Sequence, residues 1–474
     1  MGLDQSEQFW GYHSEWNLGS PGGWDYQRIT QEIGKSVWDK LLTYENPEIK
    51  LDFIDPLLSP VNGLVNLLVE AHRARNGDEP GLIAVVAEEE TLEDVVENQN
   101  FARALNRVDN ITGALMAPQS LELKNNIVCF QGRPVSVIFM DFNSDVLLSL
   151  HRKHDLTPVL QAVREGRVIN PRGTEPINVK SLFEVITDPD INSCFHKETI
   201  ERTPWTRRFF QRQTTGPKGE PISNLVEWTR ENWEHLVLKP ERGYSGMGVR
   251  VGGIHDNVDD EIALAIKEGS YIVQKKVPLF LWAEDIPELD TANQRVVLNT
   301  FQTDFRCLFG ADDMFGFVGR YGQVPTNVGS GGGFQPIAVL RSDISVAEAT
   351  DRINKMILNM DYNHVAKVVE LQEGLALDNH FTYLLGPVKM ALRPRLITPG
   401  QIDRLENYCR GIWADCLTLE KMWKNDELDH MIKIEPEELE IARSQPWNGS
   451  SAIFASDGIF SFGAHEKSAV DGIA

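Results

Sequence analysis

The stretch at residues 236–251 limits the fold of this 474-residue chain more than any other part of its sequence. Apolar residues at 236–238 and an alternating run at 249–251 predict two strands joined by a loop. The loop holds three glycines: Gly243, Gly246 and Gly248. Because glycine lacks a Cβ and tolerates positive φ, backbone amides in such a loop can approach an anion closely. Lys239 ends the first strand and adds a positive charge, so the stretch predicts a phosphate cradle.

Two other phosphate-binding patterns do not fit this loop, and one plain alternative stays open. A P-loop requires GxxxxGK[ST] followed by a helix, whereas the element that follows this loop contains β-branched residues. The GxGxxG spacing of a dinucleotide-binding fold is absent as well. A glycine-rich β-hairpin without a ligand is an equally good interpretation of residues 236–251 taken alone.

The composition excludes several classes of protein. Hydrophobic residues make up 42% of the chain and charged residues 24%, which is typical of a soluble globular protein. The net charge of −23 argues against nucleic acid as a partner, because a phosphate backbone would be repelled. The sequence has no apolar run long enough to cross a membrane. The five cysteines are scattered and odd in number, so we expect a reducing, cytoplasmic environment without a disulfide framework.

Further motifs follow the glycine loop in a fixed order. Residues 271–278 (YIVQKKVP) predict a strand that leads into an extended link, whose backbone groups can hold an adenine. Asp304-Phe305-Arg306 and, on the next strand, Arg320 place two arginines among alternating apolar positions. Residues 327–333 (NVGSGGG) add a second glycine-rich loop. These neighbours favour a nucleotide site over a plain hairpin.

This ordered set of motifs resembles the circularly permuted branch of the ATP-grasp superfamily, which includes eukaryotic-type glutathione synthetases and glutathionylspermidine synthetases. Upstream, residues 135–139 (VSVIF) resemble a strand of that branch. Residues 164–171, which lead to Lys180, resemble the segment that delivers a second ATP-binding lysine. The likeness covers roughly residues 80 to 340.

The resemblance implies an α+β fold in which a nucleotide is held between two α+β lobes, followed by a mainly helical C-terminal region. It divides the chain into four parts: 1–80, an N-terminal segment with a possible metal-binding strand; 81–175, an α/β substrate domain; 176–342, the ATP-grasp lobes; and 343–474, a helical region with a tail.

The resemblance also implies an activity, a cofactor and partners. The activity would be an ADP-forming carboxylate–amine ligase that makes an amide or peptide bond through an acyl phosphate. ATP and two Mg²⁺ would be the cofactors, and a small carboxylate and an amine the substrates. The alternative is a catalytically silent nucleotide-binding or scaffold protein on the same fold. A homodimer is the oligomeric state compatible with the resemblance.

The resemblance also implies roles for individual residues, according to their positions in the matching motifs. Nucleotide contacts are expected at Lys180, Lys239, Gly243, Tyr244, Ser245, Gly246, Gly248, Gln274, Lys275 and Val277. Stabilisation of the negative charge that develops during phosphoryl and acyl transfer is expected from Arg320, Arg306 and Asn327. Plain alternatives remain for three of these groups. Arg306 fits a structural ion pair, Lys180 fits a solvated charge on a helix, and residues 331–333 fit a flexible surface turn.

The magnesium ligands match the resemblance least well. ATP-grasp enzymes often hold Mg²⁺ with a Glu-x-Asn pair on one strand, where alternation puts both side chains on the same face. In the permuted branch that pair lies before the strand at 82. There, Asp52 is the counterpart of the Glu, but Ile54 stands where Asn is expected. The metal candidates are therefore Asp52, Asp55, Glu241 and Asp304.

Overall fold

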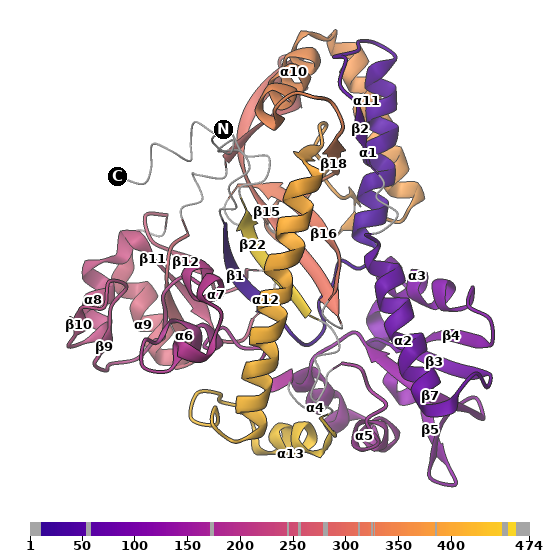
Figure 1. Ribbon diagram of the computed structural model, residues 1–474, viewed down its shortest axis with the longest axis vertical. Coiled ribbons are helices and arrows are strands. Elements are labelled where there is room, and N and C mark those ends of the chain that lie inside the picture. The colour runs from indigo at the N-terminus through magenta and orange to yellow at the C-terminus, as the bar shows by residue number, and fades with distance from the viewer. Residues whose placement is uncertain are drawn as a thin grey trace.

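The expected α+β class is confirmed by the computed structural model, in which separate sheets are flanked by helices (Figure 1). The structure describes residues 11–53, 58–170, 175–243, 246–254, 257–277, 283–310, 313–323, 326, 328–383, 386–447 and 454–460.

The largest sheet joins strands from opposite ends of the chain. Its order is β1 (Gly11–Asn17), β22 (Phe454–Phe460), β15 (Arg295–Gly310), β16 (Asp313–Gly322) and β17 (Gly333–Gln335), and β14 (Ala283–Asp290) also pairs with β15. All these pairings are antiparallel. Residues 296–301 and 305–309 are parts of one long strand, β15, because no turn separates them.

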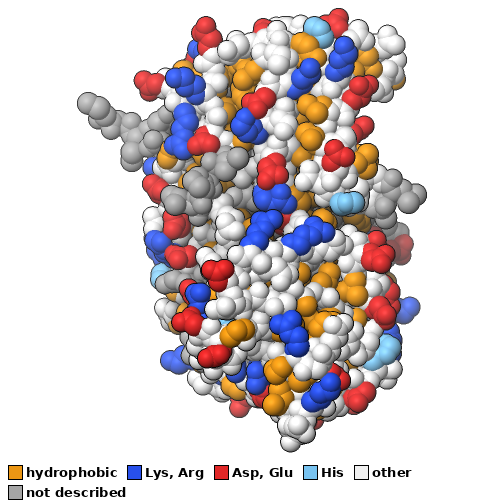
Figure 2. Space-filling model, turned by 90° about the vertical axis from the view of Figure 1, so that its right-hand side faces the viewer, with side chains coloured by type: hydrophobic (Ala, Val, Ile, Leu, Met, Phe, Trp, Pro, Cys, Tyr) orange, Lys and Arg blue, Asp and Glu red, His pale blue; other side chains and the backbone are white. Residues whose placement is uncertain are grey.

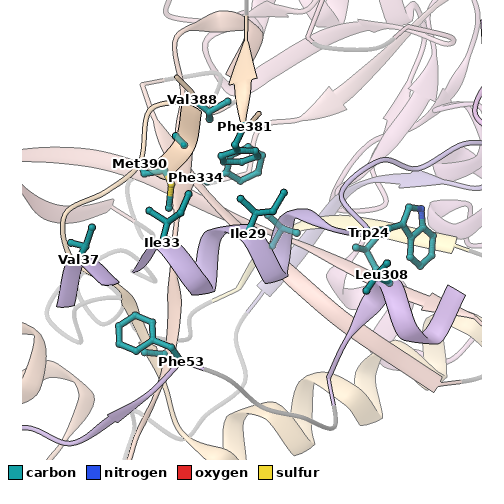
Figure 3. Close-up of a cluster of buried hydrophobic side chains, with 14 of the residues drawn as sticks. Trp24, Ile29, Ile33, Val37, Phe53, Leu308, Phe334, Phe381, Val388 and Met390 are labelled. Atoms are coloured by element: carbon teal, nitrogen blue, oxygen red, sulfur yellow. The ribbon is translucent and has the colours of Figure 1, made fainter. Parts of the chain in front are cut away.

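Long helices cover this sheet and extend beyond it. Helix α12 (Pro399–Lys424) lies across the sheet in Figure 1 and begins with a capping box between Thr398 and Gln401. Helix α1 (Tyr26–Leu42) buries Ile29, Ile33 and Val37, which are one helical turn apart. Figure 3 shows these side chains packed with residues from distant parts of the chain, among them Phe334, Phe381 and Met390.

A second sheet contains parallel strands. Its order is β4 (Ile111–Met116), β3 (Gly81–Val86), β7 (Arg133–Met140), β6 (Ile127–Phe130) and β5 (Leu121–Lys124). Strands β3, β4 and β7 are parallel, and helices α2 (Pro60–Asn76), α3 (Val96–Leu105), α4 (Ser144–Lys153) and α5 (Thr157–Arg164) flank them. The run at 82–87 is buried throughout because central parallel strands are covered on both faces.

The third sheet contains the glycine-rich stretch. Its order is β12 (Arg250–Val251), β11 (Leu236–Pro240), β13 (Tyr271–Lys275) and β8 (Thr206–Arg208). Helices α8 (Leu225–Glu231) and α9 (Val258–Glu268) belong to the same lobe, as do α6 (Leu182–Thr187) and α7 (Lys197–Arg202) at its border (Figure 1). Strand, loop and strand are therefore found in the expected order at 236–251.

The region expected to be mainly helical is interrupted by short strands. Helices α10 (Val346–Asn359), α11 (Tyr362–Asp378), α12 and α13 (Pro436–Ser444) occupy most of it. Between α11 and α12 lie β19 (Thr382–Tyr383), β20 (Gly386–Pro387) and β21 (Arg395–Ile397). Strand β21 forms a small sheet with β18 (Ile337–Leu340) and β2 (Leu51–Asp52). These strands escape sequence analysis because two or three residues show no periodicity.

Candidate functional site

The described residues of the three sheets enclose a cavity of about 1310 Å³. One wall comes from the glycine loop and the hinge after β13, and a second from β1, β15 and β16. A third comes from the carboxyl ends of β3 and β7, the edge at which open α/β sheets commonly bind ligands. Ten of the sequence-predicted site residues line this cavity: Lys180, Lys239, Gly243, Gly246, Gln274, Lys275, Val277, Asp304, Arg306 and Arg320.

The glycine loop is built for a close backbone approach. Gly246 and Gly248 both have left-handed φ angles, 73° and 75°. A Cβ on Gly248 would come within 2.7 Å of Pro240, so a larger residue would distort the loop. Gly248 itself is not part of the cavity wall, whereas Gly243 and Gly246 are.

Lys180 joins this loop to the large sheet. Its ammonium donates to the carbonyl oxygen of Gly243 at 2.9 Å and lies 2.8 Å from a carboxylate oxygen of Glu15. Only 11% of its side chain is exposed, and its backbone N–H donates to the carbonyl of Glu241 at 2.9 Å. Lys180 is therefore not a solvated charge on a helix.

The segment that was expected to hold adenine presents backbone more than side chains to the cavity. Gln274 is buried, and its amide donates to the Thr206 hydroxyl at 3.0 Å. Beyond it, Lys275 at the end of β13 borders the cavity, as do Lys276 and Val277 directly after the strand. Such a segment offers peptide groups to a planar, hydrogen-bonding ligand.

A carboxylate and an arginine face each other across β15 and β16. Asp304 and Arg320 are direct partners in the strand register, and Arg320 donates to both carboxylate oxygens, at 2.7 and 3.0 Å. The Thr326 hydroxyl donates to the same carboxylate at 2.5 Å. Two residues along β15, Arg306 donates to the carbonyl of Gly22 at 2.9 Å. Both arginines thus reach the cavity from one sheet face.

Glu15 and Asn17 are cavity residues that sequence analysis missed. They lie two positions apart on β1, and both line the cavity. Together they form the Glu-x-Asn pattern that the sequence around Asp52 lacks. The signal was present as Glu15-Trp16-Asn17, in an N-terminal segment that is rich in aromatic residues.

A β-bulge between His13 and Glu15 fixes which way β1 points. His13 and Trp16 are buried, and the imidazole of His13 bonds the hydroxyls of Tyr408 and Thr203. Burial, aided by the charge of Arg202, lowers the pKa of His13 to about 3, so the ring is neutral at physiological pH. With His13 anchored in the core, Glu15 and Asn17 face the cavity.

The far end of the cavity is acidic. Asp141, at the carboxyl end of β7, accepts from the Ser20 hydroxyl at 2.9 Å and from the Asn98 amide at 2.6 Å. Burial raises the pKa of Asp141, and burial raises the pKa of the adjacent Glu97 to about 8. Glu97 accepts from the backbone N–H groups of Gly23 and Asp25 at 3.0–3.1 Å and so fixes the loop after β1.

Several predicted site residues lie elsewhere. Asp52 is on β2, pairs with Arg341 at 3.2 Å and does not line the cavity. Glu241 lines a second, smaller cavity behind the glycine loop. Tyr244, Ser245, Asn327 and Asp55 lie outside the described residues, as does Ile54. Of residues 331–333, Gly331 is exposed in a turn, and Gly333 is buried in β17.

The chemistry of the wall fits Mg-ATP. Glu15, Asn17 and Asp304 offer the oxygen ligands that Mg²⁺ prefers. Lys180, Lys239, Arg306 and Arg320 supply positive charge for phosphates, and the glycine loop supplies backbone amides. Within the described part of the chain, no three His, Cys, Asp or Glu side chains gather as a metal site. A metal here would therefore rely on Asn17 and on the bound nucleotide for its remaining ligands.

None of the helices in the described ranges is long and apolar enough to cross a membrane.

Comparison with known proteins gives partial structural similarities. No protein-family model matches the chain, and no curated protein matches it either. A glutathione synthetase-like effector from Globodera pallida is 11% identical, with a TM-score of 0.37, and the match covers 65% of this chain and 64% of the effector. A RimK-domain ATP-grasp protein from Sphaerobacter thermophilus is 13% identical (TM-score 0.27; 59% and 83% covered). D-alanyl-alanine synthetase A from Vibrio cholerae is 10% identical (TM-score 0.30; 62% and 81% covered). The chain spans less than two thirds of the length of the Globodera effector, and all three similarities are partial.

Proposed function

We propose that this chain is an ATP-dependent carboxylate–amine ligase of the cytoplasm that forms an amide or peptide bond and releases ADP and phosphate. One observation carries the proposal. Two carboxylate–cation pairs, Glu15 with Lys180 and Asp304 with Arg320, face the same cavity. Each pair joins a side chain suited to Mg²⁺ with a side chain suited to phosphate.

The paired charges explain how the residues would respond to a nucleotide. When a metal takes over Glu15 and Asp304, Lys180 and Arg320 lose their carboxylate partners and become available to phosphate oxygens. Mg-ATP would supply a phosphoryl group that activates a carboxylate. The protein's part is to position the reactants and to stabilise charge, since phosphoryl transfer needs little covalent help from side chains.

The other reactants would bind at the acidic end. Asp141 and Glu88 border the cavity there, beside the loop at 20–23. Negative charge suits an ammonium group and repels a second carboxylate, so we assign the amine substrate to this end. The carboxylate substrate would then lie between it and the arginines on β15 and β16.

Turnover with paired substrates tests the proposal. ADP and phosphate release is measured against a panel of carboxylates crossed with amines, and strict dependence on both supports the ligase. A silent nucleotide-binding protein, the second candidate, would bind Mg-ATP without turnover for any pair. A stable phosphorylated product without an amide would contradict ligation.

A lysine substitution tests the placement of the nucleotide. Lys239→Ala is expected to weaken ATP binding by about tenfold to a hundredfold, the cost of one charge-assisted phosphate contact. Lys267→Ala, an exposed lysine on α9 of the same lobe, is the matched control and is expected to leave the affinity unchanged. Unchanged affinity in Lys239→Ala would rule out this position for the phosphates.

A further inference from the structure

A second cavity of about 250 Å³ lies behind the glycine loop. It is separate from the larger cavity in which we place the nucleotide, called the nucleotide cavity below. It is lined by residues of β8 and β13, the start of α8, the end of α9, Glu241 directly after β11, and Lys433 from the segment before α13. Its volume equals about eight water molecules at ~30 Å³ each, which suits a small metabolite and is too small for a nucleotide.

Glu241 is a buried carboxylate without a partner in this cavity. It is only 5% exposed, and its side chain makes no hydrogen bond or ion pair with any residue that the structure describes. Burial raises the pKa of Glu241, while the charges of Arg208, Lys433 and Arg242 oppose that rise. A buried carboxylate without a partner is costly, so a cationic group beside it would be stabilising.

Lys433 supplies the opposite charge. Its ammonium donates only to the carbonyl of Gly269, at 3.4 Å, and forms no ion pair with a described carboxylate, Glu241 included. Arg208 adds a second cation, which shares Glu184 with Arg212. Because Arg208 and Arg212 share the single carboxylate of Glu184, positive charge is in excess on this side of the cavity.

Two exposed apolar side chains border the cavity. Phe210 is 44% exposed and Ile266 is 49% exposed, although both are large hydrophobic side chains. Arg208 and Arg212 lie 5.7 and 5.0 Å from the centre of the Phe210 ring, which holds the ring at the opening. An apolar group that emerges between the two charges would cover this surface.

We propose that this cavity is an effector site for a free α-amino acid with a small apolar side chain. The ammonium group pairs with Glu241, the carboxylate pairs with Lys433 and Arg208, and the side chain contacts Phe210 and Ile266. An amine alone or a carboxylate alone satisfies only half of the site.

The site is connected directly to the nucleotide cavity. The backbone of Glu241 donates to Ser270 and accepts from Lys180, whose ammonium contacts the glycine loop. Because coupling between two ligands is reciprocal, the amino acid and ATP are expected to change each other's affinity by the same factor.

Calorimetric titration of the full chain without nucleotide tests the site. The probes are glycine, L-alanine, L-valine and L-leucine, with isobutylamine and isovalerate as the analogues of L-valine that lack one charge. L-Valine is expected to bind at one site, and each analogue about tenfold or more weakly, because each loses one charge-assisted contact. No saturable binding by any amino acid, or equal binding by the analogues, would overturn the proposal.

Variants locate the ligand. Glu241→Gln and Lys433→Gln are each expected to weaken L-valine binding about tenfold or more. The matched controls Glu231→Gln and Lys421→Gln replace exposed residues outside the cavity and are expected to bind like the parent. Lys239→Ala should also retain L-valine binding. If only that variant loses it, the amino acid occupies the nucleotide cavity and the effector site is refuted, whatever the fate of the ligase proposal.

Discussion

At the scale of single residues, the candidate site contains two ion pairs. Glu15 pairs with Lys180, and Asp304 pairs with Arg320, so each of these four charges has an opposite charge beside it in the ligand-free cavity. The arrangement links the two ligands. Phosphate competes with a carboxylate for each cation, and a metal that binds the carboxylates removes that competition. ATP and Mg²⁺ are therefore expected to bind cooperatively.

Glu15→Gln tests metal binding by the carboxylate and phosphate binding by its cationic partner separately. The variant keeps the side-chain shape but loses the charge that would hold Mg²⁺, so Mg-dependent turnover is expected to fall about a hundredfold. ATP affinity measured in a chelator should not fall, because Lys180 is released from its partner. Glu288→Gln is the control, since Glu288 pairs with Lys389 at 2.7 Å outside the cavity. A parallel loss of metal-free ATP binding would contradict the exchange.

Because the imidazole of His13 is buried, the stability of the fold is expected to depend on pH in the acid range. The unfolded ring takes up a proton near pH 6.5, but the folded ring does so only near pH 3. Between these values the unfolded chain binds the extra proton, so stability falls as the pH falls, by up to about 1.4 kcal/mol per pH unit. His13→Gln should lower the thermal midpoint at pH 7 and flatten its decline between pH 6.5 and 4.5. His154→Gln, an exposed control, should keep the parent slope; an equally steep decline in His13→Gln would refute this account.

At the scale of elements, the sequence predicted the site residues that lie in local motifs. It did not predict those whose position depends on pairing between distant strands. The lysines, the Asp304-Phe305-Arg306 motif and Arg320 were found because each lies in a strand or loop with its own pattern. Glu15 and Asn17 were missed because β1 acquires its place only by pairing with β22, from the other end of the chain. The bulge that aims Glu15 into the cavity also breaks the alternation on which strand recognition depends.

A truncation tests the dependence of β1 on β22. Among the described strands, β1 pairs only with β22, which in turn pairs with β15. A chain that ends after Trp447 should therefore lose Mg-dependent turnover and have a lower thermal midpoint, while ATP binding in a chelator changes less. A chain that ends after residue 460 retains β22 and should behave like the parent. Full Mg-dependent activity in the shorter chain would show that β1 needs no partner.

At the scale of the whole molecule, three sheets meet around one ligand cavity. Acidic and basic side chains are interspersed over the face in Figure 2, so the net charge of −23 is not gathered in one patch there. The division into 1–80, 81–175, 176–342 and 343–474 stays a prediction. Residues from all four ranges line the cavity, Glu15 from the first and Phe381 from the last, so the lobes share one site.

A ligand that bridges these lobes should stabilise the whole chain. Mg-ATP at a hundred times its dissociation constant is expected to add about 2.7 kcal/mol to the free energy of unfolding. The measurement is the thermal midpoint with Mg-ATP, compared with ATP in a chelator and with Mg²⁺ alone. If the two components alone raise the midpoint as much as the pair does, the lobes are not joined through the metal and the nucleotide together.

The pairing of β1 with β22 also orders events during synthesis. Translation adds about 5–20 residues per second, and more than 400 residues separate β1, with Glu15 and Asn17, from its partner strand β22. Until β22 is synthesised, β1 has no described neighbour in the sheet. A nascent chain that has not yet reached β22 therefore lacks the partner strand of Glu15 and Asn17. Any activity that needs these two residues would begin only after β22 has been synthesised.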